Sequence, residues 1–143
     1  MNQAKPGPVL RRRILIVDDC TLTRRLMESV LGRAGFDVYF AESGAVAIDA
    51  LVGGARGRRS MVDGLPSFDL LLVDVNMPGL SGPETVRRLR SRGFTKPVVA
   101  CSAGDSEEDV AACLAAGSDA FVRKPVSAQA LLAACEGILS RAA

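Results

Sequence analysis

Five polar residues stand where apolar runs of the chain end, and their types could carry out chemistry together. Asp18 and Asp19 follow one apolar run, Asp74 follows a second, Ser102 a third, and Lys124 a short fourth run. In an open sheet of parallel strands, ligands bind beyond the carboxyl ends of the strands. We therefore expect three carboxylates, one hydroxyl and one ammonium group to meet at a single edge of a sheet.

This set of side chains predicts a metal-assisted phosphoryl site. Clustered carboxylates repel one another, and a bound cation relieves that repulsion. Oxygen ligands without histidine favour a hard ion, Mg²⁺ or Mn²⁺. Lys124 and Ser102 would supply a positive charge and a hydrogen-bond donor to phosphoryl oxygens, and a carboxylate that attacks phosphorus would form an acyl phosphate.

The elements that must position these residues alternate between strand and helix. Apolar runs predict strands over residues 14–17, 38–41, 68–73, 97–101 and 120–122. Leu22, Leu26, Val30 and Ala34 recur at helical spacing before Gly35. A second helix is predicted to begin at Ser43 and to run through Val46, Ala47, Ala50 and Leu51, and a third to begin at Pro83 and to run through Val86 and Leu89. A fourth is predicted over residues 105–116, before Gly117. A fifth is predicted after Ser127, with an inward side made of Leu131, Leu132, Cys135, Ile138 and Leu139. Five such units predict an α/β fold, a doubly wound five-stranded parallel sheet with helices on both faces.

Length and composition limit the classes of protein that remain. The chain has 143 residues, the size of one domain, with a net charge of +2 and no histidine. The absence of histidine excludes serine–histidine and cysteine–histidine nucleophile pairs and the usual zinc sites. The four cysteines, at positions 20, 101, 113 and 135, are predicted to be buried small residues in a reducing compartment. No apolar run is long enough to span a membrane, so we expect a cytoplasmic protein.

Two segments lie outside the strand–helix pattern. Residues 1–12 are interpreted as a flexible leader before a domain at residues 13–141. Residues 53–67 are rich in Gly, Arg and Ser and connect a predicted helix to the next predicted strand. Such helix–strand connections usually have about 2–6 residues, so this one is much longer than usual. This connection is either a functional insertion or a tolerated surface loop, because long loops cost little entropy.

Four motifs in order resemble the receiver domain of bacterial two-component response regulators. They are ILIVDD at residues 14–19, LLLVDVNMPGLSG at 70–82, VVACSA at 98–103 and FVRKP at 121–125. The resemblance covers residues 13–141 and implies the flavodoxin-like, CheY-like (βα)5 fold with strand order 2-1-3-4-5. It also implies a phosphoacceptor that assists its own phosphorylation and dephosphorylation, and not an enzyme that turns over an external substrate.

The resemblance assigns a role to each matching position. Asp74 is expected to accept the phosphoryl group, and Lys124 to pair with it. The metal ligands are expected to be Asp19 directly, Asp18 through water, Asp74, and the backbone carbonyl of Asn76. Ser102 and Phe121 are the expected switch residues, although a phenylalanine in a short apolar strand is also ordinary core.

Partners and context follow from the same resemblance. The donor would be a histidine kinase or a histidine phosphotransfer protein, and the downstream target would bind the face made by the fourth helix, fifth strand and fifth helix. We expect neither direct DNA binding nor membrane association. A free-standing receiver is the preferred interpretation, and a receiver from a hybrid histidine kinase is the alternative.

Two other functions compete with this prediction. Haloacid-dehalogenase-type phosphatases also use an aspartate at a strand end, but they need a second aspartate where this chain has Asn76. Alternatively, arginines could bind a cyclic dinucleotide or another anion. The candidates for that role are Arg56, Arg58 and Arg59 in the long connection and Arg87, Arg88, Arg90 and Arg92 around the third predicted helix.

Overall fold

A computed structural model describes residues 11–52, 68–104, 106–124 and 127–142 of the chain. Its five strands are parallel and lie in the order β2-β1-β3-β4-β5. The predicted fold class and strand order are therefore confirmed. The strands are β1 (Arg13–Val17), β2 (Asp37–Ala41), β3 (Leu70–Asp74), β4 (Val98–Ser102) and β5 (Ala120–Arg123).

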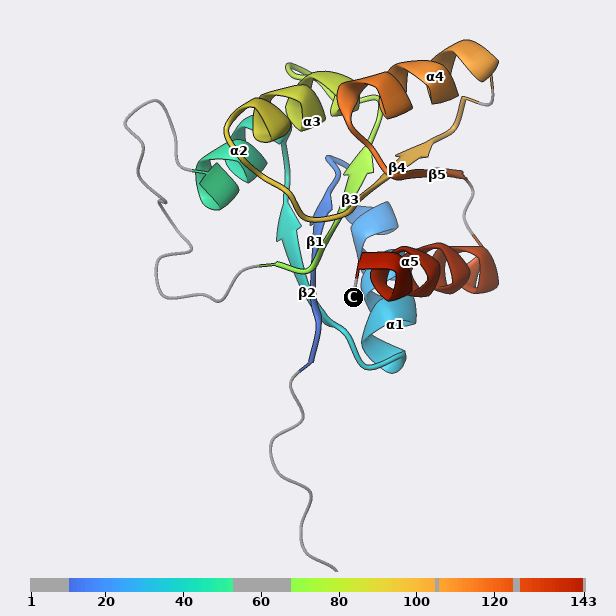
Figure 1. Cartoon of the computed structure of the whole chain (residues 1–143). Helices are drawn as coiled ribbons and strands as arrows, with labels where there is room; N and C mark the ends of the chain where they lie inside the picture. The colour runs from blue at the N-terminus through green and yellow to red at the C-terminus, as the bar shows by residue number, and fades with distance from the viewer. Residues whose placement is uncertain (1–10, 53–67, 105, 125–126, 143) are drawn as a thin grey trace, which may run out of the picture.

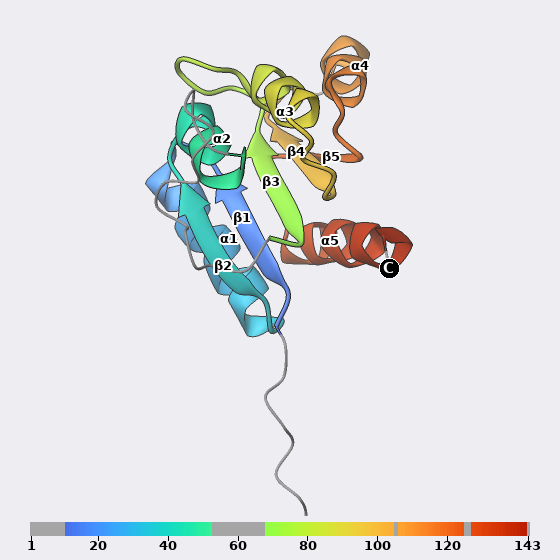
Figure 2. The same cartoon turned by 60° about the vertical axis from the view of Figure 1, so that its left-hand side comes forward.

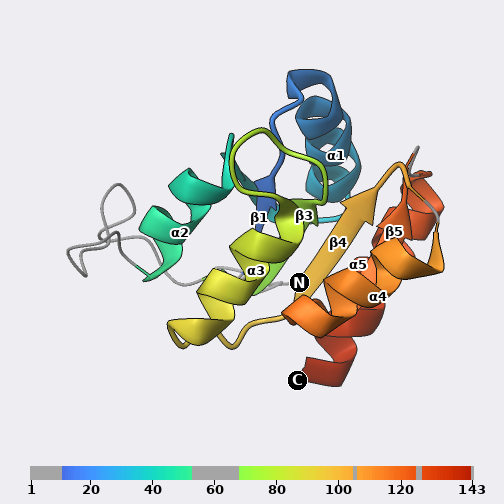
Figure 3. The same cartoon turned by 90° about the horizontal axis from the view of Figure 1, so that it is seen from above.

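Helices cover both faces of the sheet. Figures 1 and 3 show α2, α3 and α4 on one side and α1 and α5 on the other, and Figure 2 shows the same layers from a second direction. The helices are α1 (Thr21–Arg33), α2 (Gly44–Val52), α3 (Gly82–Ser91), α4 (Glu107–Ala116) and α5 (Ala128–Ala142).

The central strands are apolar on both faces because each face carries its own core. Along β1, Ile14 and Ile16 pack in the cluster beneath α1 and α5, while Leu15 and Val17 pack in the cluster beneath α2 and α3. This alternation follows from the two-residue period of a strand. It explains why a continuous apolar run, and not an alternating one, marks the strands that hold the site.

The buried side of α1 differs from the prediction. Leu22 is 67% exposed and Leu26 is 60% exposed, whereas Met27 and Leu31 are the buried residues of this helix. The sequence offers two overlapping apolar stripes, and only the packing against α5 and the sheet selects between them. Val46 on α2 is likewise exposed, with Ala47 and Ile48 facing the core.

Short polar residues set several helix starts. The Ser81 hydroxyl accepts a hydrogen bond from the Glu84 N–H, and Pro83 lies in the first turn of α3, as predicted. Ser43 and Ser127 make the same type of bond at the starts of α2 and α5. Ser106 caps α4, which therefore begins later than the predicted residue 105.

Several predictions fall on residues that the structure does not describe. These are the leader over residues 1–10, the long connection over residues 53–67 with its arginines, and positions 105, 125 and 126. Among the described residues, no helix has the length and apolar character needed to cross a membrane.

Candidate functional site

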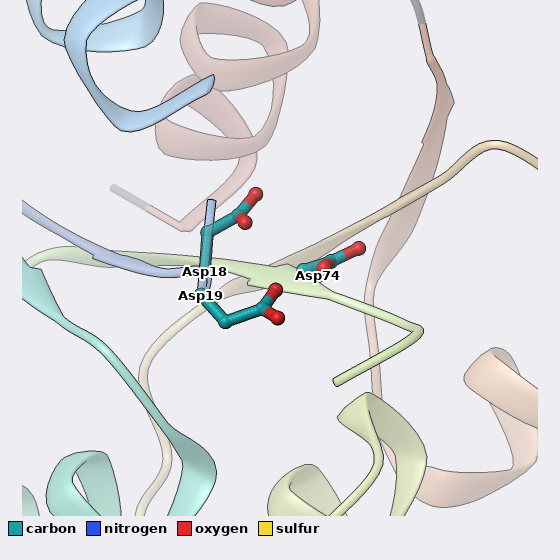
Figure 4. Close-up of side chains that lie close together, drawn as sticks. All are labelled: Asp18, Asp19 and Asp74. Carbon is teal, nitrogen blue, oxygen red and sulfur yellow. The ribbon is translucent and has the colours of Figure 1, made fainter. Parts of the chain in front are cut away.

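Three carboxylates meet at the carboxyl edge of the sheet. Asp18 and Asp19 follow the last residue of β1, and Asp74 is the last residue of the neighbouring β3. One oxygen from each of the three lies within 4.8 Å of the others. Figure 4 shows the three side chains gathered at the ends of these two strands.

Lys124 contacts two of these carboxylates from the carboxyl end of β5, the strand at one end of the sheet. It follows β5, and its Nζ lies 3.0 Å from Asp18 Oδ2 and 3.1 Å from Asp74 Oδ1. Burial alone lowers the pKa of Lys124, but its hydrogen bonds to the two aspartates outweigh that effect and raise the pKa. The site therefore contains a fixed ammonium ion between two buried carboxylates.

Asp18 and Asp19 are neighbours with different surroundings. Asp18 is buried, and its Oδ1 accepts a hydrogen bond from the Cys20 N–H while its Oδ2 accepts one from Lys124. Asp19 is exposed, and within the described part of the chain its carboxylate has no hydrogen bond or ion pair. Of these two carboxylates, Asp19 is therefore the one that is open to solvent.

Asp74 is buried at the carboxyl end of β3. Desolvation raises its pKa, although the hydrogen bond and charge of Lys124 and the Asn76 N–H act in the opposite direction. The backbone conformation that follows Asp74 is fixed by Gly82, whose N–H donates to the Val75 carbonyl at 2.9 Å. A Cβ at Gly82 would lie 2.5 Å from the Asp74 carbonyl oxygen, so only glycine fits there.

Ser102 and Phe121 lie on the neighbouring strands. Ser102 ends β4, is fully buried, and its hydroxyl oxygen accepts a hydrogen bond from the Gly104 N–H. The hydroxyl proton remains able to donate. Phe121 on β5 is half-buried and packs against a cluster of Val75, Ala100 and Cys113.

This arrangement suits a hard cation and an incoming anion. The carboxylate oxygens are ligands that Mg²⁺ and Mn²⁺ accept, and their mutual repulsion falls when a cation binds. Lys124 provides the balancing positive charge beside Asp74. The chemistry of the donor set thus fits a divalent metal that retains positions for phosphoryl oxygens.

A family model for the response regulator receiver domain matches residues 14–136. The chain belongs to the response regulator receiver family. The resemblance found from the four motifs is therefore confirmed, and the receiver domain accounts for most of the chain.

Curated relatives of this receiver domain occur in several protein contexts. It is 36% identical over 118 residues to the sensor histidine kinase RcsC of Salmonella typhi, covering 82% of this chain and 11% of that protein. It is 31% identical over 131 residues to a probable transcriptional regulatory protein of Picosynechococcus, and the match covers 92% of this chain and 50% of that protein. It is 36% identical over 121 residues to the two-component response regulator ORR41 of Oryza sativa, covering 83% and 87%. The chain thus spans from about a tenth to most of the length of these relatives.

Solved structures show the same fold. A putative response regulator from Chloroflexus aurantiacus matches with a TM-score of 0.78 at 28% identity, covering 92% of this chain and 99% of that one. Chemotaxis protein CheY4 of Vibrio cholerae matches with a TM-score of 0.74 at 25% identity, covering 90% and 99%.

Sequence reasoning about the receiver domain missed or misplaced three side chains. Cys20 is exposed beside the acidic cluster, so the prediction that all four cysteines are buried is wrong at this position. Arg24 was not singled out, yet its guanidinium reaches back to the Asp18 carbonyl. Arg90, suggested as an anion ligand, instead donates to the carbonyls of Gly117, Phe94 and Lys96 and to Asp119.

Proposed function

We propose that this receiver domain accepts a phosphoryl group on Asp74 in a Mg²⁺-dependent reaction. The observation that carries the proposal is the contact of Lys124 Nζ with Asp18 and Asp74, in a site where the Asp19 carboxylate lies within 4.8 Å of both aspartates. An Asp74 oxygen attacks phosphorus, the bond from phosphorus to the donor nitrogen or oxygen breaks, and the donor leaves with the electron pair. The product is an acyl phosphate on Asp74.

Each neighbouring residue has a distinct part in this reaction. Asp19 would hold the metal directly, Asp18 through water, and Asp74 and the Asn76 backbone carbonyl would complete the protein ligands. A bound Mg²⁺ supplies charge neutralisation for the phosphoryl oxygens. Lys124 then pairs with a phosphoryl oxygen in place of the Asp74 oxygen that it contacts before reaction.

Ser102 and Phe121 would couple phosphorylation of Asp74 to a change in the shape of the protein surface. Ser102 ends the strand next to the one that ends in Asp74, and its hydroxyl proton, which the bond from Gly104 leaves unused, would be donated to a phosphoryl oxygen. Phe121 lies beside Ala100 in the sheet and would turn further inward. The face of α4, β5 and α5 then presents a different surface to a target protein, as expected of a two-state switch.

The proposed partners follow from the donor chemistry. The phosphoryl donor is a histidine kinase or histidine phosphotransfer protein, and the site belongs in the cytoplasm where such donors act. The receiver returns to its starting state by hydrolysis and does not turn over an external substrate. Relatives include both a sensor histidine kinase and a response regulator, so a free-standing receiver and a hybrid-kinase receiver both stay as proposals.

Acetyl phosphate with Mg²⁺ tests the proposed function. We expect wild type to gain one phosphoryl group by intact mass, the Asp74→Asn variant to gain none, and an Asp74 peptide to carry the modification. A Glu136→Gln variant is the matched control, since it removes an exposed carboxylate on α5. Equal incorporation into wild type and Asp74→Asn, or no incorporation into folded wild type, would contradict the proposal.

A further inference from the structure

In the part of the chain that the structure describes, the Asp19 side chain lacks contacts that would orient its carboxylate. Its carboxylate is exposed and, within the described residues, has no partner that fixes its direction. A metal ligand that is already held in place binds the ion more tightly, because ordering it on binding costs free energy. Contacts to the backbone around Asp19 are one way in which the fold can supply that order.

Arg24 contacts the backbone on both sides of Asp19. Its guanidinium Nη1 donates to the Asp18 carbonyl at 3.0 Å, and its backbone N–H donates to the Cys20 carbonyl at 3.0 Å. The first carbonyl belongs to the peptide that precedes Asp19, and the second lies one peptide beyond it. The second bond is the backbone bond of the first helical turn, which any residue here would make, so the contribution specific to the arginine is the guanidinium bond to the Asp18 carbonyl.

The guanidinium is itself held in place. Its Nη2 donates to Thr21 Oγ1 at 3.1 Å, and its Cζ lies 5.9 Å from the centre of the Phe40 ring on β2. Phe40 is 40% exposed, and the guanidinium lies within cation–π distance of the face of its ring. Cys20 occupies the N-cap position of α1 without an oxygen side chain to cap the helix, and the Arg24 guanidinium adds a link between the loop and α1 through the Asp18 carbonyl and Thr21.

We propose that Arg24 is a positioning residue that orients Asp19 for the divalent metal ion. This inference rests on the proposed function, since it concerns the same metal site. Arg24 does not touch the reacting atoms. It fixes the Asp18–Cys20 backbone, and the fixed backbone directs the Asp19 carboxylate toward Asp18 and Asp74.

The test measures Mg²⁺ binding by calorimetry, without any phosphoryl donor. We expect Arg24→Met to weaken Mg²⁺ binding about 10-fold, the lower end of the effect of losing an outer-shell contact. Arg25→Met is the matched control, because Arg25 is the next residue of the helix, is exposed, and carries the same charge. We expect Arg25→Met to bind Mg²⁺ within about 2-fold of wild type, because an exposed charge is screened by solvent.

A second variant separates geometry from charge. Arg24→Lys retains the positive charge but cannot bond the Asp18 carbonyl and the Thr21 hydroxyl through a planar fork. We expect its Mg²⁺ affinity to lie between those of wild type and Arg24→Met. In metal-free protein, the amide resonances of Asp18 and Asp19 should shift in Arg24→Met and stay in place in Arg25→Met.

Phosphorylation by acetyl phosphate gives an independent measurement. In Arg24→Met, the Mg²⁺ concentration for half-maximal rate should rise about 10-fold, in step with the calorimetric constant. The rate at saturating Mg²⁺ should stay near that of wild type, because Asp74, Lys124 and Ser102 are unchanged. A variant that simply loses its fold would lower the saturated rate instead.

Two results would overturn the inference while leaving the proposed function intact. One is equal Mg²⁺ affinity in Arg24→Met and Arg25→Met, and the other is an Arg24→Lys variant that matches wild type. If wild type binds Mg²⁺ but takes no phosphoryl group, the proposed function fails, and the calorimetric comparison of the Arg24 variants still decides the role of Arg24.

Discussion

At the scale of single residues, the site places Asp74 in surroundings that oppose its charge. The carboxylate is buried at the end of β3, and burial raises its pKa above the ordinary 3.8 despite the contact with Lys124. The folded protein therefore bears a free-energy cost for keeping Asp74 ionised. A cation bound at this site would lower that free-energy cost, because its positive charge stabilises the ionised carboxylate.

Replacing Asp74 with asparagine should stabilise the metal-free protein in a pH-dependent way. Well below pH 3.8 the carboxyl is protonated in the folded and unfolded states, so the difference between the variants is small. As pH rises through the raised pKa, wild type loses stability relative to Asp74→Asn, and the difference levels off above that pKa. Urea unfolding in a chelator, from about pH 3 to about pH 7, measures the difference. A difference that stays constant or falls with rising pH would contradict this expectation, and Glu136→Gln should show no such trend.

At the scale of elements, the close approach of α3 to β3 sets the backbone of the site. Gly82 begins α3, and the Cβ of any other residue there would come within 2.7 Å of Val75 Cα and 2.5 Å of the Asp74 carbonyl oxygen. Both atoms belong to the backbone, so a side chain could fit only if the end of β3 moved. The position of Asp74 is therefore coupled to the start of a helix.

Gly82→Ala should destabilise the domain by about 1–3 kcal/mol, the usual cost of overpacking. The matched control is Gly137→Ala in α5, where a Cβ would have nothing within 4 Å. That change should stabilise the domain by about 0.5–1 kcal/mol, because alanine favours a helix over glycine. Urea unfolding of both variants provides the comparison. Equal shifts of the same sign would show that helix propensity alone accounts for both positions.

At the scale of the whole molecule, one arginine joins several segments at the edge of the sheet where the strands begin, opposite the site. Arg90, near the end of α3, donates to Gly117 O, Phe94 O, Lys96 O and Asp119 Oδ2. These acceptors belong to the segments that lead into β4 and β5. Arg90 thus joins the end of α3 to the two connections that lead into β4 and β5.

Arg90→Met should destabilise the fold by about 2–3 kcal/mol, because charged hydrogen bonds are lost and carbonyls lose partners. Arg87→Met, on the exposed side of the same helix, should change stability by less than about 0.5 kcal/mol. Thermal or urea unfolding measures both. Phosphorylation of folded Arg90→Met by acetyl phosphate should stay near the wild-type rate, since Arg90 lies at the opposite edge of the sheet. A variant with normal stability and impaired phosphorylation would contradict this assignment.

The sequence by itself determined the strands, their alternation with helices and the residues at their carboxyl ends. Runs such as residues 14–17 and 70–73 need no knowledge of neighbours, because a strand buried on both faces must be apolar throughout. Asp18, Asp74 and Lys124 could be placed together from topology alone, and the structure brings them within hydrogen-bond distance through Lys124.

Only the tertiary structure decided which side of each helix is buried and what long side chains contact. Leu22 and Leu26 lie on a plausible apolar stripe of α1, but Met27 and Leu31 fill the space against the sheet. Arg24 and Arg90 are indistinguishable in the sequence from the exposed arginines beside them. Their roles depend on carbonyls that the fold places within reach of a flexible side chain, and local sequence patterns do not encode those contacts.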